Sequence, residues 1–365
     1  MKIRSINFHE KLIDAQREGS LVIFAGAGVS MGPPSNYPSF IGLVEEIASW
    51  AGKEWRKEVE PPERCLGRLV HEGKNVHEQV VRLLSSPDSK HKPLHENLLK
   101  LFAIHNQVRI VTTNFDSHFE SAAINVFGQL PEIFRAPALP LGSDFSGIIY
   151  LHGSVLGHPE KIVLTDQDFG RAYLTEGWAT RFLQAMFSQY TVLFIGYSHD
   201  DTVMHYLSRG LPPEGTKPRF SLIRADKDPI EWRYRGIEPL SYSYENENDH
   251  SQLDLAVGGW VDWANRGALD TEQRIKDLVI LPPPLDEESQ DFLQWAITDP
   301  VGVIFFIRHA KGPDWLLWAN ERKYLDRLFK QADLSPIDRK IAYWVADNFV
   351  VDYASALLSG RNYLR

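Results

Sequence analysis

The stretch LVIFAGAGVSMGPP, from Leu21 to Pro34, begins as an apolar run, passes into small residues and ends in two prolines. The run Leu21–Ala25 predicts a buried β-strand, and the small residues after it predict a tight turn at its carboxyl end. Two chemistries suit this turn. The segment Gly28–Gly32 matches the G-x-S-x-G pattern of a hydrolase nucleophile, whereas Gly26–Gly28 matches half of a dinucleotide-binding loop.

Apolar runs with strand character alternate with segments of helical periodicity over the first two thirds of the chain. This alternation predicts an α/β fold with a doubly wound parallel sheet of the Rossmann type. The predicted strands are Leu21–Ala25, Val108–Thr112, Ile148–Leu151, Thr191–Ile195 and Phe220–Ile223. The predicted helices are His9–Arg17, Phe40–Ala51, Leu94–Phe102, Phe119–Phe127, Trp178–Tyr190 and Thr202–Leu211. Parallel sheets bind ligands at the carboxyl ends of their strands, so the residues after each strand are considered together.

Small and polar residues follow four of these strands. They are Gly26, Ala27, Gly28 and Ser30, then Thr113, Asn114 and Asp116, then His152 and Gly153, and finally Gly196, Tyr197, Ser198, Asp200 and Asp201. Taken singly, Asn114 and Asp116 are explained as helix caps, and His152 as a hydrogen-bonded core histidine. Their joint occurrence at four strand ends predicts one ligand site at the edge of the sheet.

The hydrolase interpretation of Ser30 fits this turn poorly. A nucleophile elbow lies on a mid-sheet strand and leads at once into a helix. Here the strand is the first predicted in the chain, two prolines follow the serine, and the next helix begins only near Ser39. A standard dinucleotide fingerprint also fits poorly, because the spacing is G-x-G-x-x-x-G and no acid ends a second strand about 20 residues on. What remains is a glycine turn whose backbone N–H groups approach a pyrophosphate, followed by a loop, Met31–Phe40, that covers the nucleotide.

In this order, the motifs G-A-G-x-S, T-x-N-x-D, H-G and G-x-S resemble the sirtuin family, and most closely the sirtuin-like domains of bacterial antiphage defence proteins. The resemblance covers Leu21 to Ser243. It implies an NAD+ site whose phosphate-binding turn is formed by Gly26, Ala27, Gly28 and Ser30, with Gly196 and Ser198 near the adenosine ribose and phosphates. It also implies that Asn114 lies beside the nicotinamide ribose, that Asp116 contacts the nicotinamide carboxamide, and that His152 is the catalytic histidine. Thr113, next to Asn114 in the same motif, is expected to be a further cofactor-binding residue.

The departures from deacylating sirtuins point to a different reaction. One cysteine, Cys65, cannot build their four-cysteine zinc module, and Thr113 stands where their second motif has glutamine. The segment Tyr37–Phe40 replaces their acid-phenylalanine-arginine sequence. The resemblance therefore implies hydrolysis of NAD+ to ADP-ribose and nicotinamide, as an antiphage effector that depletes NAD+. An NAD-dependent deacylase or ADP-ribosyltransferase, or a sensor that binds NAD+ or ADP-ribose without consuming it, remains an alternative.

The chemistry of this reaction assigns roles to the side chains at the strand ends. Asn114 binds a ribose hydroxyl or the attacking water, and His152, with a near-neutral pKa, takes a proton from one of them. Ser30 is expected to add about one hydrogen bond, roughly 0.5–1.5 kcal/mol, to nucleotide binding. No metal cofactor is expected, because Asp200 and Asp201 beside His199 are better explained as helix-capping acids than as metal ligands.

Composition excludes several classes of protein. With 48 acidic and 39 basic residues, the net charge of −9 argues against a dedicated nucleic-acid surface. The lone cysteine excludes an internal disulfide. The amino-terminal residues lack a signal-peptide core, and no apolar run approaches the roughly 18 residues of a membrane span. We therefore expect a cytoplasmic protein that binds the small molecule NAD+ and neither a membrane nor nucleic acid.

The proline-rich segment Val279–Ser289 predicts a domain boundary. We expect a catalytic domain over residues 1–281 and a helical segment over residues 282–365, either a cap or the start of a larger helical sensor domain. Uncontrolled NAD+ hydrolysis would kill the cell, so we also expect self-association and a trigger, such as a phage protein or a partner defence protein. Trp315 and Trp318 in the helical segment are either interface anchors or core residues.

Overall fold

The computed structural model describes residues 2–140, 144–197, 217–244, 250–265, 267–283, 286–326, 328 and 334–358. The chain divides into two compact units. The sheet unit comprises Ser5–Ala264, and the helical unit comprises Asn265–Arg365 together with Met1–Arg4. The predicted helix Thr202–Leu211, the acids Asp200 and Asp201, and the predicted site residue Ser198 lie outside the described residues.

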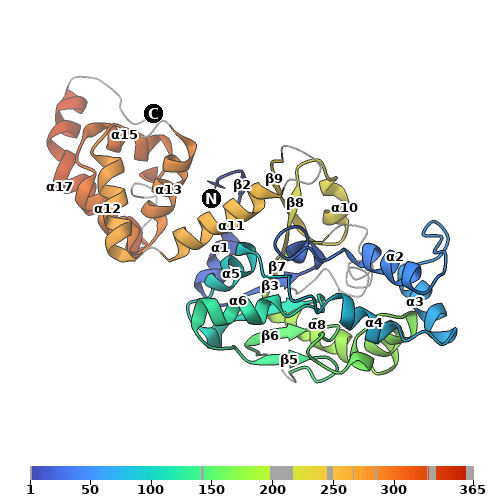
Figure 1. The fold of residues 1–365 in the computed structure, drawn as a ribbon. Coiled ribbons are helices and arrows are strands. Elements are labelled where there is room, and N and C mark those ends of the chain that lie inside the picture. The colour runs from blue at the N-terminus through green and yellow to red at the C-terminus, as the bar shows by residue number, and fades with distance from the viewer. Residues whose placement is uncertain are drawn as a thin grey trace. The chain divides into compact units, whose positions relative to one another are not determined.

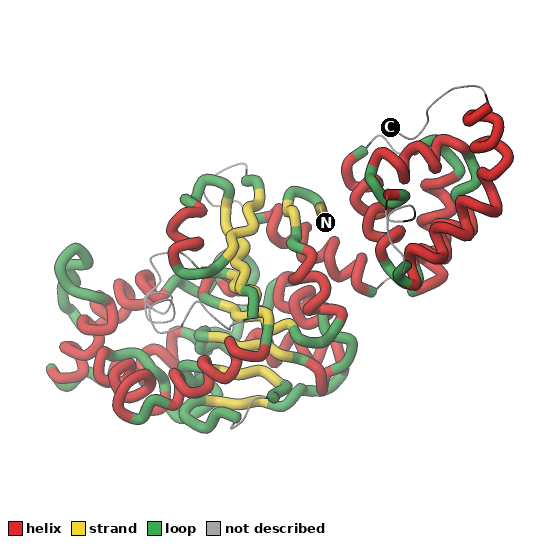
Figure 2. The backbone as a smooth tube through the Cα atoms, turned by 180° about the vertical axis from the view of Figure 1, so that it is seen from behind, coloured by secondary structure: helices red, strands yellow, loops and turns green. Residues whose placement is uncertain are grey.

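Seven parallel strands form the centre of the sheet unit (Figures 1 and 2), in the order β5-β6-β4-β3-β7-β8-β9. Their bounds are β3 Leu21–Ala25, β4 Arg109–Thr112, β5 Ile133–Arg135, β6 Gly147–Tyr150, β7 Thr191–Ile195, β8 Arg219–Arg224 and β9 Glu238–Tyr242. The predicted doubly wound α/β fold, followed by a helical segment, is confirmed. The two strands that the sequence does not reveal, β5 and β9, lie at the two edges of the sheet, and β9 contains Pro239, a residue that edge strands tolerate.

The central strand is β3, which pairs with β4 on one side and with β7 on the other. From β3 the chain moves to its neighbour β4, then to β5 at the edge, and returns to β6 between them. It then crosses over to β7 on the other side of β3 and continues through β8 to β9. That the strand is the first predicted in the chain is therefore no argument against a nucleophile elbow, because this crossover places it in the middle of the sheet. Such a reversal of strand order creates a crevice at the strand ends, where ligands of doubly wound sheets bind.

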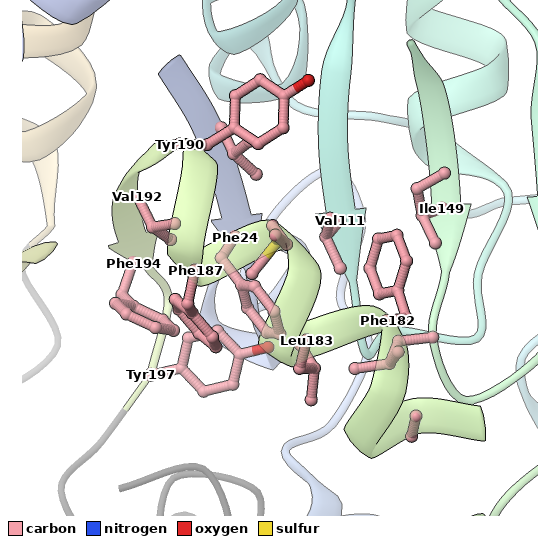
Figure 3. Close-up of a cluster of buried hydrophobic side chains, with 14 of the residues drawn as sticks. Phe24, Val111, Ile149, Phe182, Leu183, Phe187, Tyr190, Val192, Phe194 and Tyr197 are labelled. Carbon is pink, nitrogen blue, oxygen red and sulfur yellow. The ribbon is translucent and has the colours of Figure 1, made fainter. Parts of the chain in front are cut away.

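One face of the sheet packs on α8, Trp178–Gln189, through a continuous apolar cluster (Figure 3). Phe24 of β3 and Phe187 of α8 are both buried completely, and the Phe24 ring lies 5.1 Å from that of Phe194 and 5.7 Å from that of Tyr197. Burying a side chain of this size stabilises the fold by about 1.5–3 kcal/mol. Because Tyr197 is the second residue after β7, this core reaches the strand ends and supports the turns there.

Helices cover the rest of the sheet unit. Their bounds are α1 Glu10–Arg17, α2 Phe40–Trp50, α3 Pro62–His71, α4 Val76–Leu83, α5 Pro93–Lys100, α6 His118–Phe127, α7 Asp166–Gly170, α10 Pro229–Tyr234 and α11 Ser251–Ala264. The shorter elements of this unit are β2 Ile6–Asn7, the 3₁₀ turns η1 Ala27–Ser30, η2 His105–Gln107 and η3 Pro159–Lys161, and the π-helical turn η4 Arg171–Thr175, whereas β1 Lys2–Ile3 belongs to the helical unit. As predicted, a helix begins after Ser39, whose Oγ accepts a hydrogen bond from the Gly42 N–H (3.1 Å). Helix α5 packs against both α6 and α11.

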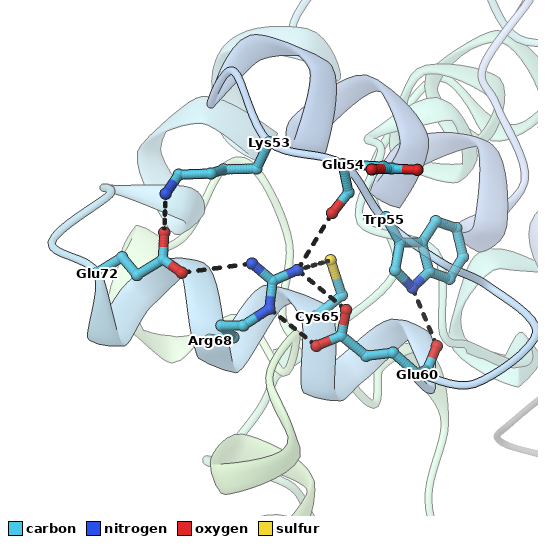
Figure 4. Close-up of polar contacts among 7 residues, drawn as sticks. All are labelled: Lys53, Glu54, Trp55, Glu60, Cys65, Arg68 and Glu72. Atoms are coloured by element: carbon cyan, nitrogen blue, oxygen red, sulfur yellow. Dashed lines mark hydrogen bonds and ion pairs between the residues drawn. The ribbon is translucent and has the colours of Figure 1, made fainter.

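A polar cluster around Arg68 fixes the connection between α2 and α3 (Figure 4). The guanidinium donates to the Glu60 carboxylate at 2.9 and 3.0 Å and to Glu72 at 3.3 Å. The only cysteine, Cys65, is buried beside it, and this burial raises the pKa of the thiol to about 11. The thiol is therefore protonated at neutral pH and has a structural place in the protein.

The helical unit packs α12 Ala268–Val279, α13 Glu287–Thr298, α14 Gly302–His309, α15 Pro313–Glu321 and α17 Pro336–Leu358. The rings of Trp315, Trp318 and Trp344 lie 5.6–5.7 Å from that of Phe306, and all are 3% exposed or less. Of the two predicted fates of Trp315 and Trp318, core packing is the one observed. The predicted linker Val279–Ser289 falls inside this unit, and the functional boundary near Leu281 stays a prediction. None of the helices in the described ranges is long and apolar enough to cross a membrane.

Candidate functional site

Six of the ten predicted site residues line one pocket at the carboxyl ends of β3, β4 and β6. They are Ala27, Ser30, Thr113, Asn114, Asp116 and His152. The other walls are mainly apolar and comprise Tyr37, Pro38, Ser39, Phe40, Leu43, Leu84, Phe115, Val163 and Phe169. The structure thus brings these strand ends together as expected, and the end of the Met31–Phe40 loop forms part of the wall. A concave, apolar pocket with a few converging polar groups is typical of small-molecule sites.

The predicted glycines lie behind this pocket and pack the β3 turn against the β7 turn. A Cβ at Gly26 would lie 2.8 Å from the Gly196 oxygen, and one at Gly28 would lie 2.8 Å from the Gly196 Cα. Gly196 adopts a φ of +75°, which also favours glycine. The N–H groups of Gly26 and Gly28 donate to the carbonyls of Ile195 and Gly196, both at 2.9 Å. In this structure those two N–H groups are engaged within the protein, and the phosphate-binding role of the turn stays a prediction.

The end of β4 and the segment after it are held by hydrogen bonds to the end of β3 and to the turn after β7. Thr112 Oγ1 donates to the Ala25 carbonyl (2.9 Å) and accepts from the Asn114 N–H (3.0 Å). The hydroxyls of Thr113 and Tyr197 lie 2.8 Å apart and form a hydrogen bond. These bonds fix the backbone of the T-x-N-x-D motif, so its side chains project from a rigid base.

Asp116 is both a pocket residue and a cap. Its Oδ1 accepts a hydrogen bond from the His118 N–H (3.0 Å) at the start of α6, which is the structural explanation that the sequence left open. The same residue lines the pocket, where the Tyr37 ring stacks on that of His118 at 5.1 Å. Burial, together with the nearby Asp116 carboxylate, raises the pKa of Tyr37. Capping and ligand contact are therefore compatible roles for Asp116.

Ser30 forms hydrogen bonds with two buried side chains. Asn114 Nδ2 donates to its Oγ (3.2 Å), and His95 Nε2 lies 3.2 Å from the same oxygen. A serine within hydrogen-bond reach of a histidine suggests an activated nucleophile. The other ring nitrogen, His95 Nδ1, however accepts the Lys92 N–H (3.0 Å), and burial, with the neighbouring His118, lowers the pKa of His95 well below its usual value.

The tautomer of His95 argues against the hydrolase geometry. A neutral imidazole carries one proton, and since Nδ1 is an acceptor here, the proton lies on Nε2. A nitrogen that already holds a proton cannot remove one from Ser30. His95 is a site residue that sequence reasoning missed, because its place at the third position of α5 gives no sign that it reaches the turn after β3.

His152 is buried beneath two aromatic residues that the sequence did not identify. Its Nε2 forms a 2.8 Å hydrogen bond with the Tyr173 hydroxyl, and its ring meets that of Phe169 edge-on at 5.2 Å. This burial lowers the pKa of His152 to about 3. The expected near-neutral pKa is therefore wrong for this state, because the ring is desolvated. Tyr173 lies on the π-helical turn η4, a feature often found at functional sites.

Within the described residues, no three histidine, cysteine or acidic side chains converge as a metal ion would require. His199, Asp200 and Asp201 lie outside those residues. The candidate site is therefore described by hydrogen-bonding side chains and apolar walls alone.

Comparison with known proteins points to the sirtuins. The family described as SIR2-like domain matches residues 108–240, which include the ends of β4, β6 and β7. This segment of the chain is therefore similar to SIR2-like domains. Among curated relatives, an uncharacterized protein named y4cA from Sinorhizobium fredii is 28% identical over 331 residues, 80% of this chain and 27% of that protein. Defense-associated sirtuin 2 of Bacillus subtilis is 22% identical over 254 residues, 65% of this chain and 23% of that protein.

The predicted resemblance to sirtuins, and to their defence-associated type, is confirmed by these matches. The chain spans about a quarter of the length of the curated relatives it matches. One similar solved structure comes from work titled "Structural Basis for the Mechanism and Regulation of Sir2 Enzymes". It is 12% identical, with a TM-score of 0.36, over 71% of this chain and 98% of that chain.

Proposed function

We propose that the SIR2-like domain hydrolyses NAD+ to ADP-ribose and nicotinamide, and that it serves as an effector of antiphage defence by depleting NAD+. The observation that carries this proposal is the convergence of Ser30, Asn114 and His152 from three strand ends on one apolar-walled pocket. The match to Defense-associated sirtuin 2 supports the defence role.

The reaction breaks the bond between the nicotinamide nitrogen and C1′ of the ribose. The bonding pair leaves with the nicotinamide, which becomes neutral, and the sugar passes through an oxocarbenium-like state. Water then adds to C1′ and loses a proton. This leaving group needs no strong acid, so the protein has to orient the substrate, support the charge on the ribose and admit one water.

The residues of the pocket suit these tasks. Asn114 turns its Nδ2 toward Ser30, which leaves Oδ1 to accept a hydrogen bond from a ribose hydroxyl or from the water. Asp116 offers a carboxylate to the nicotinamide amide. His152 is neutral at physiological pH because burial lowers its pKa, so it acts as a hydrogen-bonding group without a positive charge that would oppose the oxocarbenium. The aromatic rings of Phe40, Phe115 and Phe169 exclude bulk water.

The test is incubation of the 365-residue chain with NAD+ alone, with the products separated by chromatography. We expect equal amounts of nicotinamide and ADP-ribose. Asn114→Ala is expected to slow this turnover about a hundredfold. Asn125→Ala, at an exposed asparagine of α6, is the matched control and is expected to retain the parent rate.

Three other results would count against hydrolysis. Turnover that requires an acyl-lysine peptide would indicate a deacylase, and turnover that requires a protein acceptor would indicate an ADP-ribosyltransferase. Binding of NAD+ or ADP-ribose by calorimetry, without any loss of NAD+, would indicate a sensor.

We further propose that the domain self-associates and that the helical unit sets its geometry. The structure shows where to cut the chain for this test. Ending it at Leu281 would strip α12 of its partner α14 and leave the Val279 carbonyl without the Trp315 Nε1 that donates to it (3.0 Å). Ending it after Ala264 removes the whole helical segment. Light scattering and the NAD+ assay are then applied to the chain that ends after Ala264 and to the parent. We expect the molecular mass in solution and the turnover rate to change together, and a truncated chain that associates and turns over NAD+ like the parent would refute the proposal.

A further inference from the structure

We propose that His95 is a positioning residue that acts through Ser30 to set the orientation of the Asn114 side-chain amide. The inference rests on the proposed NAD+ hydrolysis, because the Asn114 oxygen is the group that the reaction would use. His95 does not line the pocket. Its ring is fully buried behind Ser30, so any effect on the reaction passes through its neighbours.

The hydrogen bond between His95 and Ser30 runs from the histidine to the serine. The Lys92 N–H donates to His95 Nδ1 (3.0 Å), so the ring proton lies on Nε2 and points at Ser30 Oγ (3.2 Å). The ring has no freedom to turn over, because it packs edge-on against Phe119 at 4.9 Å and His118 at 5.5 Å. His95 therefore acts as a fixed donor to the serine.

Both acceptor positions of the Ser30 hydroxyl oxygen are occupied. A hydroxyl oxygen has two acceptor positions, and here His95 Nε2 takes one while Asn114 Nδ2 (3.2 Å) takes the other. With His95 in place, Ser30 Oγ accepts the hydrogen bond from the Asn114 amide. The hydroxyl proton of Ser30 then points away from Asn114. Without the histidine, Ser30 can rotate and donate to Asn114, which then gains by turning its oxygen toward the serine.

The side-chain amide of Asn114 can take two orientations. Its backbone is fixed by the bond from its N–H to Thr112 Oγ1 (3.0 Å), so the remaining freedom is rotation of the amide about its own axis. An amide turned the wrong way presents N–H₂ where Oδ1 should accept a proton from a ribose hydroxyl or water. Ser30, expected from the sequence to add a single hydrogen bond to nucleotide binding, thus also transmits orientation from His95 to Asn114.

A structural alternative assigns His95 only the capping bond to Lys92, and two substitutions separate the two roles. Asparagine places an oxygen near the position of Nδ1, so His95→Asn keeps the capping acceptor and loses the donor to Ser30. Glutamine places an N–H₂ near the position of Nε2, so His95→Gln keeps the donor and loses the capping acceptor. The two roles therefore predict opposite orders of activity.

For the full chain we expect His95→Asn to lower kcat for NAD+ about tenfold, with KM changed less than about twofold. His95→Gln should restore most of that kcat even if its melting temperature is lower. Ser30→Ala and the double variant Ser30→Ala/His95→Asn should have the same kcat, because both break the same connection. The control His158→Asn, at an exposed histidine, should match the parent. A His95→Asn variant with the parent kcat, or a His95→Gln variant slower than it, would overturn the inference.

A readout that needs no turnover keeps this inference separate from the proposed function. In ¹⁵N NMR spectra, His95 should show the Nε2–H tautomer unchanged between pH 5.5 and pH 8. The side-chain amide signal of Asn114 should shift in His95→Asn and stay in place in His95→Gln. A parent chain that leaves NAD+ intact but shows these shifts would refute the hydrolysis alone. An Nδ1–H tautomer would refute the positioning role whatever the activity.

Discussion

In the sheet unit the buried side chains of Ser30, Asn114 and His95 bond to one another beside a pocket, whereas in the helical unit the buried side chains of Trp344 and Asp299 bond to backbone groups at the ends of a helix. Ser30 and Asn114 illustrate the first pattern, with a side chain on both sides of each bond. In the helical unit Trp344 Nε1 donates to the Ala310 carbonyl (2.7 Å), and Asp299 Oδ1 accepts from the Gly302 N–H (2.7 Å). Each of these satisfies a backbone group that a helix end leaves without a partner.

The two kinds of buried hydrogen bond contribute differently to stability and to activity. A side chain that completes a helix end and fills a core stabilises the fold directly, and its loss leaves both a cavity and an unpaired backbone group. A polar side chain buried against another polar side chain gains little net stability, so its presence at the edge of a sheet is better explained by the ligand it serves. Substitutions in the two units should therefore separate stability from activity.

The largest effect is expected for Trp315→Ala in the helical unit. The substitution empties a buried tryptophan site and removes the donor to the Val279 carbonyl (3.0 Å), so it should destabilise this unit by about 3–5 kcal/mol. Urea unfolding followed by pulsed hydrogen exchange, read on peptides from residues 265–326, measures this unit separately. Leu317→Ala on the same helix removes a side chain that is 37% exposed and should cost about 1 kcal/mol or less. Equal losses for the two variants would contradict the assignment of Trp315 to the core.

His152→Ala in the sheet unit should show the opposite pattern. We expect kcat for NAD+ hydrolysis to fall about a hundredfold, because the variant removes a polar group of the pocket. The free energy of unfolding at pH 7.5 should change by much less than in Trp315→Ala. Circular dichroism and urea unfolding check the fold, and His158→Ala serves as the control at an exposed histidine. A folded His152→Ala variant with the parent rate would show that the site has been placed wrongly.

Acid should destabilise the sheet unit more than the helical unit. Burial lowers the pKa of His95, His118 and His152 below their usual value, whereas residues 265–365 contain a single histidine, His309. Below about pH 6.5 the unfolded chain binds protons at these three positions that the folded chain does not. Stability is therefore complete above that pH and is lost as the pH falls.

The expected size of this loss follows from the pKa of His152, which is about 3 in the folded chain. When the pH falls from 7.5 to 5.0, proton binding at His152 in the unfolded chain should lower the free energy of unfolding by about 2 kcal/mol. Urea unfolding at the two pH values, followed by a hydrogen-exchange pulse at one common pH, measures the unfolding of each unit separately. His152→Ala should be less sensitive to acid by the same amount, and equal sensitivity of variant and parent would contradict the prediction.

The sequence predicts those parts of the site that depend on local order along the chain. Leu21–Ala25 is found as a strand because five apolar residues stand together, and Asn114 and His152 are found because they follow such runs. His95 and Tyr173 are missed, because their partners Ser30 and His152 lie 65 and 21 residues away. No local periodicity tells which distant turn a helical side chain will meet. The central place of β3 is missed for the same reason, since it results from the crossover to β7.

The smallest effect is expected at Tyr173, the hydrogen-bond partner of His152. Its hydroxyl lies 2.8 Å from His152 Nε2, so a ribose hydroxyl that approaches this nitrogen has to displace it. Tyr173→Phe removes this competitor and keeps the ring that stacks on Phe169 (6.0 Å between centroids). One neutral hydrogen bond corresponds to roughly 0.5–1.5 kcal/mol, so kcat/KM for NAD+ should rise about two- to tenfold. Tyr324→Phe in the helical unit removes the same atom from a residue that does not line the pocket, and it should leave kcat/KM unchanged. A fall in kcat/KM for Tyr173→Phe would instead mean that the phenol passes a proton to or from His152, and the π-helical turn that carries it would then belong to the catalytic machinery.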